Sequence, residues 1–299
     1  MQDSLIELKF KTSINNFDSI KLMRAVIKTY ISMYSDEILD IAARGGFVIS
    51  EPMYQIEDSL YVENKVIPIN LSSLPTAIRD AEMNNRKRKR FINISKLDKL
   101  SQLLKENDYK SLNLNEKKLD FFKDIFKTVE DNILPTSDFR PGVNISQDNF
   151  FIRELEREGS RSLFIIMRHE NLKILSSLYA TLDAGVSAKR SVGNGGMEII
   201  KKKPFINGGF REPGLYLLIS PFVPTSSDFN KIDFNKSFYR IRTFSGRDYN
   251  GKSFSIYRYI QPGSFLFLNE EPEGLTDKYI DQFFIFKGFF LNGGMKNEI

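Results

Sequence analysis

The strongest constraint on the fold is a change of hydrophobic period within the first fifty residues. From Leu5 to Thr12 the apolar and polar residues alternate, which predicts a half-buried β-strand. From Phe17 the apolar residues recur at helical spacing, which predicts a helix that ends before Gly45. The apolar run Phe47 to Ile49 then predicts a second strand. This order is typical of the start of a βαβ unit.

The middle of the chain has a different composition. Residues 71–131 are rich in Lys, Asn, Asp and Leu at helical spacing, which predicts a helical insertion, with Phe126 on one of its helices. Residues 149–168 predict a hairpin that turns at Gly159, followed by a helix that ends at Gly185 and by a strand from Met197.

The turn-rich segment Pro204 to Pro213 predicts an internal boundary. Beyond it we expect a polar connection at 225–235 and the strands 215–220, 264–268 and 283–291, with a hairpin that pairs 238–244 with 253–259. Both halves combine many strands with few helices. This pattern predicts an α+β fold, compatible with two ferredoxin-like units.

Composition excludes several classes of protein. The 299 residues include no cysteine, which excludes disulfides, cysteine-ligated metals and thiol catalysis and fits a reducing cytoplasm. His169 is the only histidine, which excludes a two-histidine catalytic pair or a histidine-rich metal site. No stretch is long enough to span a membrane, and the first ten residues lack the features of a signal peptide. We therefore expect a folded cytoplasmic protein without metal or cofactor.

The sequence feature that most directly indicates a ligand is a glycine-rich loop with two adjacent bases after the predicted helix. Small residues let backbone N–H groups converge on an anion, and the two bases add positive charge, so the loop suits the phosphates of a nucleic acid. A plain helix-to-strand connection is the alternative. The candidate residues are Gly185, Val186, Ser187, Ala188, Lys189, Arg190, Ser191, Gly193, Asn194 and Gly195.

Other basic residues are candidates for RNA contact. The net charge of +5 equals the charge of the run Arg86 to Arg90 alone, so local clusters matter more than the total. That run is as well explained as a solvated surface. Arginines and aromatic residues alternate in the hairpin 238–259, which fits either base stacking or core packing. Arg140 and Arg153 are further candidates, although glutamates at 154 and 156 make a solvated hairpin the alternative.

The order of these features resembles the repeat-associated RNA-binding (RAMP) proteins of CRISPR systems, and within them the fourth Csm subunit, which caps type III-A effector complexes. That family has a loop of the form G-x-G/S-G/A-K-R-S-x-G-x-G, and residues 185–195 read GVSAKRSVGNG. The resemblance continues through the segments Lys11-Thr12, FVISEP at 47–52, GLYLLIS at 214–220, PGSFL at 262–266 and IFKGFF at 285–290. The chain departs from the family at Ser13-Ile14-Asn15, where His-Phe-Gly is frequent, and at Ser187-Ala188, where glycines are usual.

The resemblance implies two tandem ferredoxin-like domains, 1–203 and 204–299. An insertion at about 51–148 interrupts the first, and family members press it against the guide RNA as a thumb. It further implies a non-catalytic scaffold that binds the 5′ repeat handle of the crRNA and docks onto the large polymerase-like subunit and the first backbone subunit. The loop would then hold handle phosphates, with Lys11, Arg24 and Arg140 as weaker contacts.

Three alternatives remain open. A metal-independent crRNA-processing endonuclease of the same superfamily would need His169 or a tyrosine near the loop as its acid or base. A purely structural protein would use its basic segments to meet acidic partners. The equivalent type III-B subunit is the third.

Overall fold

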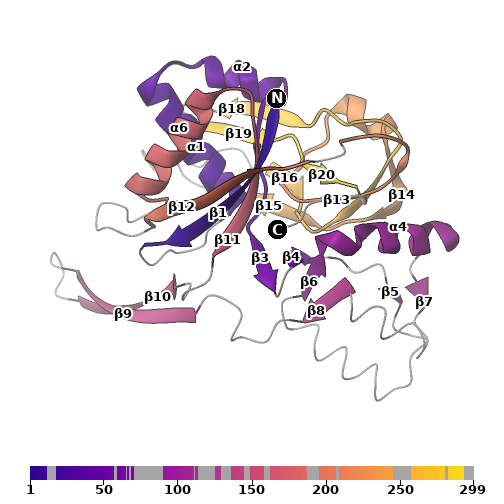
Figure 1. The fold of residues 1–299 in the computed structure, drawn as a ribbon, viewed down its shortest axis with the longest axis horizontal. Helices are drawn as coiled ribbons and strands as arrows, with labels where there is room; N and C mark the ends of the chain where they lie inside the picture. Colours follow the sequence, from indigo (N-terminus) through magenta and orange to yellow (C-terminus); the bar gives the residue numbers. More distant parts are fainter. Residues whose placement is uncertain are drawn as a thin grey trace.

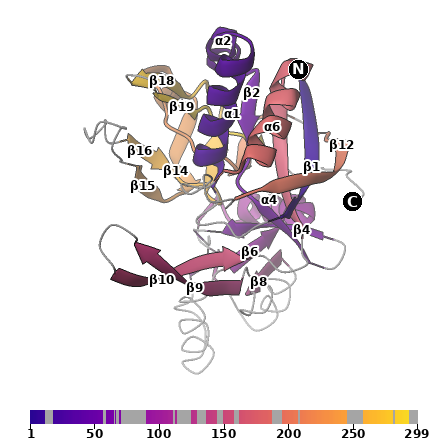
Figure 2. The same ribbon diagram turned by 90° about the vertical axis from the view of Figure 1, so that its left-hand side faces the viewer.

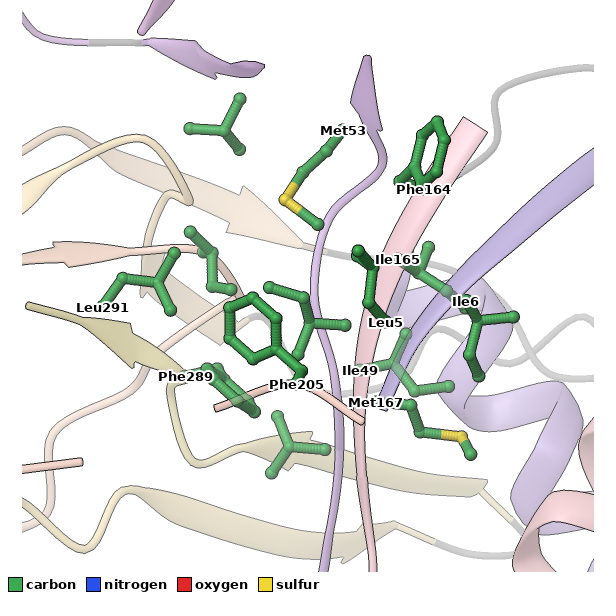
Figure 3. Packing of buried hydrophobic residues seen from close by; sticks show 14 of the residues in the cluster. Leu5, Ile6, Ile49, Met53, Phe164, Ile165, Met167, Phe205, Phe289 and Leu291 are labelled. Carbon is green, nitrogen blue, oxygen red and sulfur yellow. The ribbon is translucent and has the colours of Figure 1, made fainter. Parts of the chain in front are cut away.

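Strand β1 (Gln2–Phe10) lies inside the larger sheet of the computed structural model, between β11 and β12 (Figure 1). Ile6 and Leu8 are fully buried, as the predicted alternation requires. Leu5, on the other face, is buried as well, because residues of the second half such as Phe205 pack on that side (Figure 3). The structure describes residues 1–11, 18–56, 59–64, 66, 69–70, 90–110, 112–113, 125–128, 136–144, 149–157, 162–186, 195–206, 209–244, 257–279 and 282–292.

The first half has the strand order β12-β1-β11-β2, with antiparallel neighbours throughout. Helices α1 and α6 lie side by side on one face of this sheet (Figure 2). The α+β class is thus confirmed, and the arrangement is compatible with a ferredoxin-like βαββαβ unit. These elements are α1 (Ser19–Met33), β2 (Phe47–Ile49), β11 (Leu163–His169), α6 (Leu172–Ala184) and β12 (Met197–Pro204).

The helix predicted to run from Phe17 towards Gly45 is two helices in the structure. Helix α1 ends at Met33, and α2 spans Glu37–Ala43. Tyr34 leaves helical geometry with φ −133° and ψ −82°. The next residue, Ser35, accepts a hydrogen bond from the backbone N–H of Glu37. Short polar side chains compete in this way for backbone groups and so favour a break.

The predicted helical insertion is helix in one described part and strand in others: Leu97, Leu100 and Leu104 are the buried residues of helix α4, as their spacing predicts. Antiparallel strands extend the first sheet beyond β11 in the order β3-β4-β6-β8. Phe91 contacts Tyr54 on one face of the sheet, and Ile92 belongs to the main core on the other. These neighbouring residues therefore alternate between faces, as in a strand. Phe126 lies in β8 rather than on a helix, and Arg86 to Lys89 lie outside the described residues. The elements are β3 (Met53–Ile56), β4 (Ser59–Asn64), β6 (Arg90–Asn93), the 3₁₀ turn η2 (Ile94–Lys96), α4 (Leu97–Glu106) and β8 (Phe126–Thr128), with a short parallel pair of β5 (Ile69–Asn70) and β7 (Leu112–Asn113).

The prediction of a hairpin over residues 149–168 is wrong. Strand β10 (Asn149–Arg157) pairs instead with β9 (Thr136–Asn144), and the two form a separate ribbon below the body in Figure 1. Strand β11 is nearly continuously buried and pairs with β1 on one side and with β2 and β3 on the other. It therefore has no free edge for β10.

The second half forms a four-stranded antiparallel sheet in the order β14-β17-β13-β20, with two hairpins beside it. The expected connection at 225–235 contains a 3₁₀ helix and the start of β14. The expected strand 283–291 is interrupted at Gly288, whose φ of +70° and contact with the Phe290 ring leave no room for a Cβ. The elements are β13 (Gly214–Leu218), η5 (Ser226–Asn230), β14 (Ile232–Phe238), β15 (Ile241–Phe244), β16 (Tyr257–Ile260), β17 (Phe265–Leu268), β18 (Leu275–Tyr279), β19 (Gln282–Phe286) and β20 (Phe290–Leu291).

A buried carboxylate stabilises one end of this second half. Asp228 is fully buried, and its oxygens accept hydrogen bonds from Thr225, from the Glu273 N–H at 2.7 Å and from the Gly274 N–H at 3.0 Å. Burial opposes the charge of Asp228, but these donors outweigh it and lower the pKa below the ordinary value. The contacts join η5 to the loop that precedes β18.

The two halves meet at the backbone of Ile219. Its carbonyl accepts a hydrogen bond from the Glu51 N–H at 2.6 Å, and its N–H donates to the Phe289 carbonyl at 2.8 Å. The Glu51 carboxylate also accepts from the N–H and the hydroxyl of Ser19 at the start of α1. Ile219 itself is fully buried in a core to which both halves contribute (Figure 3).

We expect Glu51→Ala to lower the free energy of unfolding by about 1–3 kcal/mol, because the substitution leaves the buried Ser19 groups without their acceptor. Urea unfolding followed by circular dichroism measures this difference. Glu270→Ala, which removes an exposed carboxylate, is the matched control. Equal midpoints for the two variants would contradict the assigned role of Glu51.

Candidate nucleic-acid interface

The glycine-rich loop starts and ends at one point of the fold. The Val186 N–H donates to the Gly195 carbonyl at 3.0 Å, and the Lys11 N–H donates to the Gly196 carbonyl at 2.9 Å. Gly185 ends α6 with φ +85° and ψ 141°, and Gly195 also has φ +85°. Only glycine adopts this geometry at low cost, so both loop ends need their glycines.

Three of the ten candidate loop residues, Gly185, Val186 and Gly195, belong to this base. The other seven lie outside the described residues: Ser187, Ala188, Lys189, Arg190, Ser191, Gly193 and Asn194. The ends of β1, α6 and β12 converge here, so the structure brings Lys11 to the base of the loop. The Lys11 ammonium lies 3.6 Å from the Asp183 carboxylate, with the two side chains 47% and 83% exposed. Such an exposed pair contributes little to stability and can be exchanged for a phosphate.

Arg24 has a packing role in the structure. Its guanidinium lies over the Phe284 ring at 5.0 Å from the centroid and near the Phe244 ring at 6.0 Å. A cation held over aromatic rings is stabilised by their quadrupoles. Arg24 thereby connects α1 of the first half to β15 and β19 of the second.

Arg140 and Arg153 are directly opposite each other in the β9–β10 ribbon. Because residues that pair across an antiparallel ladder share a face, the register places both arginines and Arg157 on one face. Glu154 and Glu156 fall on the other face. Charges that alternate along the sequence are therefore separated by sign, although Asp138 shares the basic face.

The second-half hairpin pairs β15 with β16, and its tyrosines pack in the core. Tyr257 and Tyr259 are buried against Phe284 and Phe286. Burial raises the pKa of Tyr259 to about 12 despite the neighbouring Arg242. For these two rings the core-packing alternative is therefore the one that the structure has. Exposed arginines line the rim at 240, 242 and 258, and Phe254 lies outside the described residues.

His169 is a buried structural residue. It is 2% exposed, its Nε2 lies 3.3 Å from the Ser4 hydroxyl, and its Nδ1 lies 3.3 Å from the Asn171 carbonyl. Burial lowers its pKa below the ordinary value, against the effect of the Asn171 carbonyl. A histidine in this position is not placed to exchange protons with an RNA substrate, which weakens the endonuclease alternative.

Most of the Lys and Arg side chains that line one cavity are ion-paired, and the remaining one, Lys287, donates a hydrogen bond to the Glu273 carbonyl. This cavity of about 490 Å³ opens near Met1, between the two halves. Three of its cations already face carboxylates: Arg44 meets Glu170, Arg168 meets Asp3, and Lys231 meets Glu273. Among the described residues, no group of three or more His, Asp or Glu side chains is arranged to hold a metal ion. In the same part of the chain, no helix is both long and apolar enough to cross a membrane.

Lysines 201–203 on β12 form a basic run that our sequence analysis missed. Lys201 and Lys202 are exposed and Lys203 is half-buried. The run itself was a visible signal. Which face of the sheet each lysine lies on, and which residue of β1 is opposite it, depends on the strand pairing, which only the structure shows.

No family model and no curated protein matches this sequence. Solved structures do. A chain of the Csm3–Csm4 subcomplex of the type III-A CRISPR-Cas interference complex is 14% identical, with a TM-score of 0.59 over 97% of this chain and 99% of its own. A chain of the Csm1–Csm4 cassette in complex with AMPPNP is 12% identical, with a TM-score of 0.57 over 99% and 100%. Csm4 is the subunit common to both assemblies.

The chain has the Csm4 fold. The resemblance read from the loop and the flanking segments is confirmed at this level. A chain of the type III-B Cmr-beta complex, solved by cryo-EM with cognate target RNA and AMPPnP, is more distant. It has 10% identity and a TM-score of 0.52 over 88% of this chain and 86% of its own.

We expect His169 to titrate below its ordinary pKa of about 6.5. The single histidine makes its imidazole signal in ¹H NMR unambiguous. Stability should be full above pH 6.5 and fall as the pH drops below it, because the unfolded chain then takes up a proton that the buried ring refuses. His169→Gln should flatten the unfolding profile between pH 7.5 and 5.5. An NMR pKa at or above 6.5 would contradict the structural role.

Proposed function

We propose that this chain is the cap subunit of a type III-A CRISPR effector complex, a non-catalytic cytoplasmic scaffold that binds the 5′ repeat handle of the crRNA. The observation that carries the proposal is the near full-length match to chains from two assemblies that share Csm4. The partners named in those structures, Csm1 and Csm3, correspond to the large subunit and the backbone subunit onto which this chain would dock.

In this proposal the loop at 185–195 holds phosphates of the handle. The closed base at Gly185 and Gly195 supports it, because a loop with joined ends presents its backbone N–H groups from a defined position. Lys189 and Arg190 supply the positive charge, and Lys11 adds a cation at the base.

The β9–β10 ribbon supplies a second contact. Like charges directly opposite in a ladder destabilise it, so Arg140 and Arg153 favour an anion between them. A phosphate would satisfy both guanidinium groups at once. The ribbon falls at the end of the insertion at about 51–148, the segment that corresponds to the family's thumb.

We further propose that residues 1–203 and 204–299 are two tandem ferredoxin-like domains. The sheet order β14-β17-β13-β20 supports this, because it repeats the order of β2, β11, β1 and β12 in the first half. In the second domain the turn η5 would stand where the first has α1, and the β18–β19 hairpin where the first has α6.

The likeness to a Cmr-beta chain keeps a type III-B subunit as the second candidate. Co-expression with the type III large and backbone subunits encoded in the same genome separates the two. We expect co-purification with a Csm1-type and a Csm3-type partner. Assembly with Cmr-type partners instead would favour the second candidate.

Changing Lys189 and Arg190 together to Glu should abolish binding of the repeat-derived handle RNA, because two attractive charges become repulsive at the phosphates. Filter binding and crRNA retention in the purified complex both measure the effect. Lys28→Glu with Lys173→Glu, at exposed positions on α1 and α6, makes the same charge change outside both the loop and the insertion. Unchanged crRNA retention in the 189/190 variant would refute the loop assignment.

Incubation of the wild-type protein with repeat RNA in the absence of metal tests the endonuclease alternative. We expect the RNA to stay intact. Specific cleavage at the repeat would contradict the non-catalytic assignment, and the absence of any RNA footprint would instead favour a purely structural protein.

A further inference from the structure

Lys201 and Lys203 lie on one face of the outermost strand of the first sheet. Among the described strands, β12 pairs with β1 alone, and the register sets Lys201 opposite Glu7 and Lys203 opposite Leu5. Lys202, opposite Ile6, falls on the other face. The alternation of strand faces therefore separates two lysines from the third.

The two lysines border a hollow. It has a volume of about 180 Å³ and is lined by Leu5, Glu7, Gln55, Phe164, Lys201 and Lys203. Among the described residues that line it, Glu7 is the only carboxylate, so their net charge is positive. Neither lysine forms an ion pair with another described residue. Both charges are thus available to an anion.

The two lysines lie on the strand that leaves the glycine-rich loop, six and eight residues after Gly195. Strand β12 begins at Met197, two residues after Gly195 closes the loop base. An RNA strand that leaves the loop along β12 would meet Lys201 and then Lys203, two residues apart and so about 6.6 Å along the strand.

We propose that Lys201 and Lys203 bind phosphates of single-stranded RNA that continues from the loop, with the hollow between them taking the adjoining nucleotide. This inference rests on the proposed handle binding and extends it to a second segment of the RNA. The contact is sequence-independent, because an ammonium group binds a phosphate as a point charge without a fixed geometry.

The composition of this surface favours phosphate over an acidic protein segment. Lysine is depleted in protein–protein interfaces, where arginine is enriched for its planar, bidentate pairing. Lysines on an outermost strand also discourage strand-to-strand association. Lys202 serves that purpose as well as its neighbours do, so it makes a control that separates the two roles.

The experiment measures binding of the full chain to a single-stranded RNA that carries the 5′ handle and adjoining spacer nucleotides, at 50–200 mM salt. Loss of two phosphate contacts should lower the slope of log affinity against log salt by about 1.4, at roughly 0.7 per contact on a single strand. Between 50 and 200 mM salt the wild type should therefore lose about sevenfold more affinity than the Lys201→Ala/Lys203→Ala variant. Lys202→Ala should keep the wild-type slope, and Glu7→Gln should raise the affinity.

Several outcomes would overturn the inference. A wild-type slope in the double variant means that no phosphate is bound there, and an equal loss in Lys202→Ala means that only general charge matters. An unchanged slope with lost co-purification of a protein subunit identifies a protein occupant instead. Absence of RNA binding by the wild type contradicts the handle proposal itself. Matching urea midpoints for all variants exclude misfolding as the cause.

Discussion

The rest of the structure depends on the backbone hydrogen bonds of Ile219, which join the sheet of the second half to the first half. One hydrogen bond reaches Glu51 in the first half and the other reaches Phe289 near the C-terminal strand. Around this point Leu5, Leu215 and other apolar residues from both halves form one core. Buried backbone N–H and C=O groups cost free energy unless they are hydrogen-bonded. These hydrogen bonds of Ile219 therefore favour a single relative position of the two sheets. They also explain why segments 47–52, 214–220 and 285–290 carry the resemblance together: their backbones meet there.

Sequence periodicity predicted the elements whose type follows from their own pattern of apolar residues. It did not predict which strands pair with one another. The alternation in β1 and the helical spacing in α6 were sufficient to predict the element type, because each element buries at least one continuous apolar face. The predicted hairpin over residues 149–168 is absent because strands that are neighbours in sequence need not pair. Strand β11 pairs on both sides with strands that are distant in sequence. The insertion was predicted in part. The spacing of Leu97, Leu100 and Leu104 predicted helix α4 correctly, whereas Phe126 lies in a strand because it pairs with β6, some thirty residues earlier in the chain.

The candidate site shows the same division. Glycines, bases and the end of a helix predicted the loop, and its base has the left-handed φ values that only glycine adopts easily. The pattern could not show that Arg140 in β9 stands directly opposite Arg153 in β10, because that requires the register between the two strands. Nor could it show that Arg24 packs over Phe284 or that Tyr259 is buried, since those neighbours are some 260 and 27 residues distant in sequence.

Strand β1 connects these observations. Ser4 near its start contacts the buried ring of His169, and Glu7 in its middle lies opposite Lys201. Lys11, the residue that follows its end, donates a backbone hydrogen bond to the base of the loop. A strand fixed on both sides by ladders has little freedom to shift, because moving by one residue would exchange its buried and exposed faces. The base of the loop, the lysines of β12 and the core beside them are therefore positioned by one strand. In the proposed function this support fixes the two ends of the loop, whose own residues are mostly glycine and small side chains, relative to the RNA.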